Sequence, residues 1–250
     1  MDTVNLPFHC LVMGGTSHGG VASHAHAVGQ LIYLRRGAML CQSETMRWLM
    51  AAGQVGWIPA GMAHSAEPLA EIEGVSAYAD SAAYPDLPTE ARVVPAGGMM
   101  GLLLERLLSY EAEPWIGRRQ RLAGVIIDEL LRLAPLSQQL PLPADRRLGA
   151  LCRRVLADLG RGWLLDELAA AHGFSRASLT RAFARETGVS FGNWLAQARL
   201  LEAARLLSGG AAVGEAALQV GYQSLSAFGA AFRRHLGMAP GEFQRAQARV

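Results

Sequence analysis

Short apolar runs dominate the first part of the chain. Gln30–Leu34, Gly37–Cys41 and Val55–Pro59 are examples, and Gly, Pro and Ser residues separate them. Short apolar runs bounded by turn residues are typical of β-strands. We therefore expect the chain to begin with a domain built mainly from β-sheet.

Helical spacing replaces this pattern further along the chain. Leu122, Ile126, Leu130 and Leu133 recur three or four positions apart, which predicts a helix with one apolar face. We expect helices over Met99–Ser109 and Trp115–Leu133. Such helices cover an open side of the β domain or form the seam of a dimer, and the two uses can coexist on opposite faces.

One helical unit occurs twice between Leu164 and Phe243. Each copy has a short apolar helix, then a glycine (Gly173 or Gly221), then a second helix whose apolar residues lie four apart. A glycine there can adopt the left-handed conformation that ends a helix, and Ser175 or Ser224 can cap the helix that follows. This is the plan of a helix-turn-helix unit. Its repetition argues against an ordinary helical bundle with a charged surface.

An uncharged segment with three prolines, Ala134–Ala144, separates the two parts of the chain and is typical of an extended linker. We expect an α+β protein with three segments: a β domain with flanking helices over 1–134, a linker over 135–145 and an all-α domain over 146–250. A helix over Phe191–Leu207 would span roughly 25 Å. That length can hold two recognition helices near the ~34 Å separation of successive major grooves.

The second copy contains the run G-Y-x-S…F…AFRR…G…P…F. This stretch resembles the DNA-binding region of the AraC/XylS family of bacterial transcription factors, over about residues 143–245. One departure is Phe191, where the second copy has Pro240, and it lies at a helix start rather than on the reading surface. The resemblance implies a sequence-specific DNA-binding regulator. The residues that carry it are Gly221, Tyr222, Ser224, Phe228, Phe232, Gly237, Pro240 and Phe243.

The resemblance also implies which side chains contact double-stranded DNA. Ala177, Thr180 and Arg181 match base-facing positions of the first recognition helix, and Arg176 lies beside them. Arginine can pair with both O6 and N7 of guanine. The side chains expected on phosphates, which add affinity without sequence information, are Arg185, Arg233 and Arg234. Those that offer hydrogen bonds in the second unit are Gln223, Ser224 and Ser226.

The charge of the chain is polarised between its two parts. Residues 146–250 hold 14 Arg and 7 acidic residues, a net charge of +7, whereas residues 1–145 hold 9 Arg and 14 acidic residues, a net charge of −5. The basic part is the one with the repeated unit, as a phosphate-binding surface requires. The sequence has no apolar run of 18 residues and no leader pattern, so we expect a soluble cytoplasmic protein without membrane contact.

Histidines cluster in the β part with a recognisable spacing. His24 and His26 are followed by Gln30, and the later run Pro59-Ala-Gly61 is followed by His64. These two segments resemble the two sequence motifs of cupin barrels, with glutamine where that family often has glutamate. Alternation along a strand puts His24 and His26 on one face, and a small antiparallel barrel can bring His64 and Gln30 to the same interior.

Three imidazoles and one amide oxygen can hold one divalent metal per chain, with Ni or Zn favoured over Fe or Mn. Two other interpretations stay open. The histidines could line a pocket for an organic effector, or they could be satisfied by hydrogen bonds within the domain.

We therefore expect a homodimeric transcription regulator, not an enzyme, whose cupin-like domain senses a metal or a small molecule. The run Trp57–His64 resembles the subgroup that represses a neighbouring efflux-transporter gene. The alternative is a metal-dependent cupin enzyme, a dioxygenase or isomerase, fused to a DNA-binding tail, with Glu67 as its nearest acid or base. A DNA-bending protein is a third hypothesis, and the sensor-like first half and the small net charge argue against it.

Overall fold

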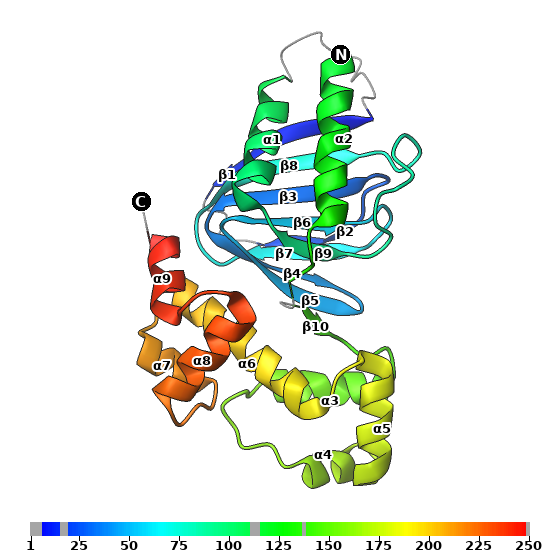
Figure 1. Cartoon of the computed structure of the whole chain (residues 1–250). Helices are drawn as coiled ribbons and strands as arrows, with labels where there is room; N and C mark the ends of the chain where they lie inside the picture. Colours follow the sequence, from blue (N-terminus) through cyan, green and yellow to red (C-terminus); the bar gives the residue numbers. More distant parts are fainter. Residues whose placement is uncertain (1–6, 16–19, 111–115, 137–138, 249–250) are drawn as a thin grey trace. The chain divides into compact units, whose positions relative to one another are not determined.

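The computed structural model describes residues 7–15, 20–110, 116–136 and 139–248 (Figure 1). The chain divides into two compact units. The first contains residues 1–41 and 50–136, and the second contains residues 42–49 and 137–250. None of the helices in these described ranges is long and apolar enough to cross a membrane.

A five-stranded antiparallel sheet forms the centre of the first unit. Its register places Gln30 opposite Tyr78 and Ile32 opposite Ser76. Because side chains alternate, Leu31 and Val75 point to the other face, where they are buried in the main apolar core. The strands, in spatial order, are β1 (Phe8–Gly15), β8 (Ile72–Ala79), β3 (Gly29–Arg36), β6 (Gln54–Ile58) and β9 (Arg92–Pro95).

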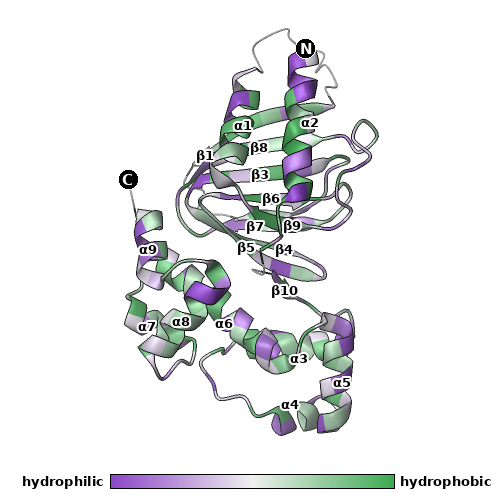
Figure 2. Cartoon of the chain, in the orientation of Figure 1, coloured by the Kyte–Doolittle hydropathy of each residue, from purple (hydrophilic) through white to green (hydrophobic). Residues whose placement is uncertain are grey.

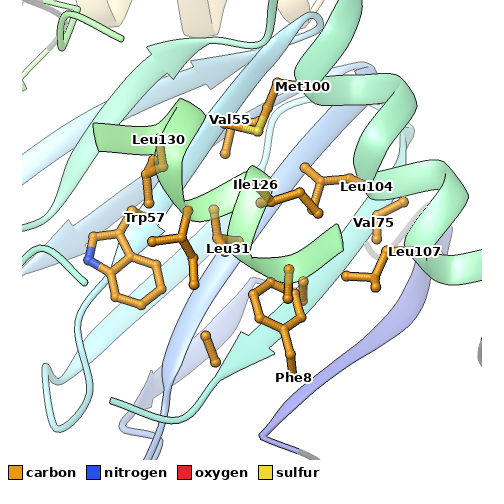
Figure 3. Close-up of a cluster of buried hydrophobic side chains, with 14 of the residues drawn as sticks. Phe8, Leu31, Val55, Trp57, Val75, Met100, Leu104, Leu107, Ile126 and Leu130 are labelled. Atoms are coloured by element: carbon orange, nitrogen blue, oxygen red, sulfur yellow. The ribbon is translucent and has the colours of Figure 1, made fainter. Parts of the chain in front are cut away.

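Two helices cover the core face of this sheet, as Figure 1 shows. They are α1 (Gly97–Ser109) and α2 (Ile116–Arg132). Leu104 and Leu107 of α1 and Ile126 and Leu130 of α2 belong to one buried cluster with Trp57 of the sheet (Figure 3). Both predicted helices are present, although Trp115 lies outside the described residues. In Figure 2, α2 carries both hydrophobic and hydrophilic residues along its length, as expected for a helix with one buried face.

A second five-stranded sheet brings two of the histidines together. In its register His24 pairs with His64, and Val21 pairs with Ala66. The predicted linker contributes a short strand, whose Gln139 pairs with Trp48. The strands, in spatial order, are β10 (Gln139–Pro141), β5 (Met46–Ala51), β4 (Ala38–Ser43), β7 (His64–Pro68) and β2 (Val21–His24).

The second unit contains the repeated helical plan. Its glycine turns are confirmed, because Gly173 and Gly221 have φ angles of 72° and 86°. The predicted caps are also confirmed: Ser175 accepts a hydrogen bond from the backbone of Ser178, and Ser224 accepts one from Ala227. The helices are α3 (Arg146–Leu156), α4 (Leu165–Ala171), α5 (Arg176–Thr187), α6 (Phe191–Ser208), α7 (Val213–Gln219), α8 (Leu225–Leu236) and α9 (Pro240–Ala248).

The helix α6 supplies the core of this unit. Trp194, Ala198, Leu201 and Ala204 form the buried stripe that the sequence predicts. The Trp194 indole Nε1–H also donates a hydrogen bond of 2.7 Å to the carbonyl oxygen of Pro141. Each helix-turn-helix unit can therefore pack its apolar pair against a common rod, and the α5 and α8 pairs are fully buried: Leu179, Phe183, Phe228 and Phe232.

Candidate nucleic-acid interface and histidine cluster

The exposed face of α5 carries every residue predicted for the first recognition helix. Leu179 and Phe183 are buried on the opposite face, so helical periodicity turns the other positions to solvent. The Arg181 guanidinium has no ion-pair partner within the part of the chain that the structure describes. It is therefore available to a DNA base. The predicted residues found exposed are Arg176, Ala177, Thr180, Arg181 and Arg185.

Three of these side chains already have partners on the protein, and for Arg185 the partner is the neighbouring Glu186, with 3.6 Å between Nη2 and Oε1. Arg176 Nη1 lies 2.7 Å from Asp166 Oδ2 on α4, and the Thr180 hydroxyl donates to the carbonyl oxygen of Arg176 at 2.9 Å. The sequence motif did not indicate Asp166. The pair holds the Arg176 guanidinium near the start of α5, so Arg176 is less free than Arg181 to change its position on DNA.

The second recognition helix presents a smaller and more apolar face. Ser224 Oγ is occupied as the helix cap and lies 2.8 Å from Ser226 Oγ. Leu225, the first residue of α8, is 60% exposed. Gly229 and Ala230 add no polar group. The predicted residues Gln223, Ser224, Ser226, Arg233 and Arg234 are all exposed, but only the arginines are long and charged.

Gly229 lies in the middle of α8, where glycine weakens a helix. A Cβ atom there would meet nothing within 4 Å, so protein packing does not require a glycine. We expect Gly229→Ala to raise the free energy of unfolding of the second unit by roughly 0.5–1 kcal/mol and to weaken DNA binding, because the added methyl group would lie on the face that is predicted to approach the groove.

Gly124→Ala in α2 is the matched control, since a Cβ atom there also meets nothing. It should stabilise its own unit without changing DNA affinity. Chemical denaturation and fluorescence anisotropy with labelled DNA measure the two effects. Unchanged DNA affinity in Gly229→Ala would show that α8 does not approach DNA closely at this point.

The three predicted histidines come together in the first unit. One ring nitrogen from each of His24, His26 and His64 lies within 4.8 Å of the others, and His24 Nε2 is 3.1 Å from His26 Nε2. His24 Nδ1 lies 2.8 Å from the carbonyl oxygen of Ala22, and His64 Nδ1 lies 2.9 Å from that of Met62. When Nδ1–H of His24 and of His64 donates to these carbonyls, Nε2 of each ring keeps a free lone pair. Metal-binding histidines are commonly oriented by such a hydrogen bond from the other ring nitrogen.

The environment favours the neutral form of two of these imidazoles, those of His26 and His64. Burial lowers the pKa of His26, and the neighbouring His24 and His64 lower it further, while the nearby Gln30 amide opposes the shift. Burial also lowers the pKa of His64, against the effect of the Met62 carbonyl. Neutral imidazole is the form that binds metals, so these two rings are ready to act as ligands at neutral pH.

Gln30 provides a fourth donor atom. It is 8% exposed, and its Nε2 donates to Ser76 Oγ at 2.9 Å and to the Tyr78 hydroxyl at 3.2 Å. Its Oε1 is buried without a hydrogen-bond partner within the described part of the chain. A buried oxygen without a partner is costly, and a metal ion would satisfy it. The donor set therefore fits a divalent metal, and Ser76 and Tyr78 are supporting residues that sequence spacing did not reveal.

Comparison with known proteins addresses the second unit most directly. Residues 168–246 match the family model of a helix-turn-helix domain. The chain is 28% identical over 236 residues to the HTH-type transcriptional regulator NimR of Escherichia coli, a match that covers 93% of this chain and 85% of that protein. It is 34% identical over 133 residues to a putative AraC-like transcription regulator of Streptomyces antibioticus, covering 50% of this chain and 44% of that protein.

Other similarities are confined to part of the chain or are weak in structure. The regulator MtrA of Neisseria gonorrhoeae is 37% identical over 102 residues, which is 40% of this chain and 34% of that protein. The DNA-binding domain of AdpA in complex with a target DNA is 33% identical with a TM-score of 0.37, covering 39% of this chain and 88% of that chain. ToxT of Vibrio cholerae is 13% identical with a TM-score of 0.43, covering 98% of this chain and 99% of that chain.

The matching family model and the matched regulators agree with the repeated helical units and the exposed arginines described above. The second unit therefore contains a helix-turn-helix domain, and the chain is similar to HTH-type transcription regulators, among them a protein named as AraC-like.

Proposed function

We propose that this regulator reads DNA mainly with α5 and senses its signal in a cupin-like first domain that holds one divalent metal. The observation that carries the proposal is the convergence of three imidazole nitrogens within 4.8 Å beside the unpartnered oxygen of Gln30. The ligands would be His24, His26, Gln30 and His64. Nickel or zinc suits this nitrogen-rich set best.

The distance between two of the ring nitrogens supports such a site. Two nitrogens bound to one metal at about 2.0–2.1 Å lie roughly 3.0–3.4 Å apart, and His24 Nε2 and His26 Nε2 are 3.1 Å apart. When bound, the metal supplies a Lewis-acid centre for a small-molecule effector. The chain's own residues hold the ligand atoms in place: backbone carbonyls orient His24 and His64, and Ser76 and Tyr78 orient Gln30.

An enzyme built on the same histidines needs an acid or base beside them. Glu67 was the candidate, but it is exposed and does not line the cavity at the histidines. No other carboxylate in the described residues lines that cavity. The residues therefore favour a sensor over a dioxygenase or isomerase. We further propose a cytoplasmic repressor of a neighbouring efflux-transporter gene, on the resemblance of the run Trp57–His64 to that subgroup.

A ligand can change DNA binding only by its difference in affinity between two arrangements of the protein. The function is tested with the full chain and DNA from upstream of its own gene and of the neighbouring transporter gene. Metal or effector should change the Kd by about 5- to 150-fold, measured by fluorescence anisotropy. Equal Kd values in every ligand state, or no protected sequence in footprinting, would reject it.

We also expect the regulator to be a dimer through its first domain. Met99 and Leu102 on α1 are 50% and 67% exposed, and Val125 and Leu131 on α2 are 44% and 42% exposed. Exposed apolar side chains concentrated on two adjacent helices mark an association surface. Leu102→Arg should convert the full chain from dimer to monomer in analytical ultracentrifugation, because a charge cannot be buried there without a partner.

The control for that experiment is Leu218→Arg, since Leu218 is 64% exposed but lies on α7. It should leave the dimer intact. A fragment that ends at Ala144 keeps the pairing of β10 with β5 and should also be dimeric, whereas a fragment from Asp145 should be monomeric and bind DNA weakly. If the fragment that ends at Ala144 is monomeric at micromolar concentration, the proposed dimer interface on α1 and α2 is wrong.

A further inference from the structure

The cavity at the histidine cluster has a polar end and an apolar end. Its volume is about 290 Å³. Along β8, Tyr78 and Ser76 lie level with Gln30 and Ile32 of β3, and Ile72 lies further along the same strand. Along β7, His64 comes first and Ala66 and Pro68 follow. The register of both sheets therefore places the donor atoms together and the apolar side chains beyond them.

The polar end carries no formal charge of its own. Among the described residues, neither a carboxylate nor an arginine lines the cavity, so three neutral imidazoles and an amide would face the metal. Such a ligand set leaves the double positive charge of the metal uncompensated. In a site lined by apolar side chains the dielectric constant is low, so an uncompensated positive charge attracts an anion strongly. An anionic donor is therefore preferred there over a neutral one.

The remaining wall offers few hydrogen bonds. Ile32, Met39 and Ile72 line it, and each is at most 7% exposed. The two hydroxyls, of Ser76 and Tyr78, already accept hydrogen bonds from Gln30. These two hydroxyls cannot pair with all the hydroxyls of a polyhydroxylated ligand, which would lose its water without full compensation, and that loss is costly. An apolar body instead gains by leaving water.

We infer that the effector is a compact apolar molecule with one anionic metal-binding group. It binds with that group at His24, His26 and His64 and with its body against Ile32, Met39 and Ile72. The exposed side chains of Leu11, Val12 and Val21, which also line the cavity, mark its rim. This inference rests on the metal site of the proposed function and adds the chemical class of the ligand.

Cyclohexanecarboxylate, cyclohexanecarboxamide and acetate test the inference on the untagged full chain loaded with Co(II). The absorption spectrum of the cobalt reports direct coordination. Cyclohexanecarboxylate should change the spectrum and bind at least about tenfold more tightly than acetate, because its ring buries several methylene groups. The amide, which has the same shape without the charge, should leave the spectrum unchanged.

Ile72→Thr tests the apolar wall, with Val75→Thr as its control on the opposite face of the same strand. Ile72→Thr should weaken the binding of cyclohexanecarboxylate by about fourfold or more, which is the equivalent of one buried methylene. It should leave the affinity for acetate unchanged. Val75→Thr should change neither the affinity for cyclohexanecarboxylate nor the affinity for acetate. If cobalt is taken up normally but cyclohexanecarboxylate binds no more tightly than its amide, or no more tightly than acetate, the inference about the effector is wrong while the proposed metal site stands. Failure to take up cobalt rejects the proposed metal site, and the inference falls with it.

Discussion

Replacing Arg181 with alanine should weaken the free energy of specific DNA binding by about 1–3 kcal/mol and relax the sequence preference at one base position. The reason is the asymmetry between the two recognition helices. Arg181 is exposed on α5 and is not held by an ion pair within the described residues, whereas the corresponding face of α8 carries Ser226 and Gly229. Ser226→Ala should therefore cost much less, since it removes one hydroxyl that already lies 2.8 Å from Ser224 Oγ.

Arg185→Ala is the matched control, because this side chain is also exposed on α5. It should weaken binding to all sequences alike and reduce the slope of log K against log salt concentration by about 1, as expected for a phosphate contact. Binding is measured by fluorescence anisotropy against the operator and single-base variants of it. Comparable losses of specificity in Arg181→Ala and Ser226→Ala would refute the asymmetry.

Replacing His26 and His64 together with alanine should remove the metal and the response to the effector. Two of the three imidazoles are then lost, and the one remaining histidine and the amide form too weak a site. Metal content and the effector-dependent change in operator Kd measure the two losses. The fold of residues 146–250 should stay intact, because these histidines belong to the other unit.

His9→Ala is the control for the double variant. The His9 ring stacks on Tyr78 at 4.9 Å but lies outside the cluster of three, so its loss should leave the metal bound. Far-ultraviolet circular dichroism and DNA binding without effector show that the second unit remains folded. A double variant that keeps its metal, or that regulates normally without it, would contradict the sensor mechanism.

The sequence predicted those features that depend on local chemistry. The serine caps at 175 and 224, the left-handed glycines at 173 and 221 and the buried stripe of α6 each follow from rules about neighbouring residues. The motif spacing also indicated that His24, His26 and His64 lie together, because two short segments in a small sheet have few ways to pair.

Features that depend on distant partners could not be predicted in this way. Gln30 is oriented by Ser76, 46 positions away in the sequence, and nothing in the spacing marks that serine. The pair of Asp166 and Arg176 depends on how α4 packs against α5. The prolines of the linker indicated an extended chain, but its pairing with β5 depends on a partner strand about which the linker sequence carries no information.

The central claim is that the first domain is a metal-dependent sensor. Metal analysis of the full chain, expressed and purified without a histidine tag and without chelators, tests it most directly. We expect about one divalent metal per chain, nickel or zinc, retained through gel filtration. Protein that emerges from this purification with no bound metal, and that takes up none when it is offered, would contradict the claim.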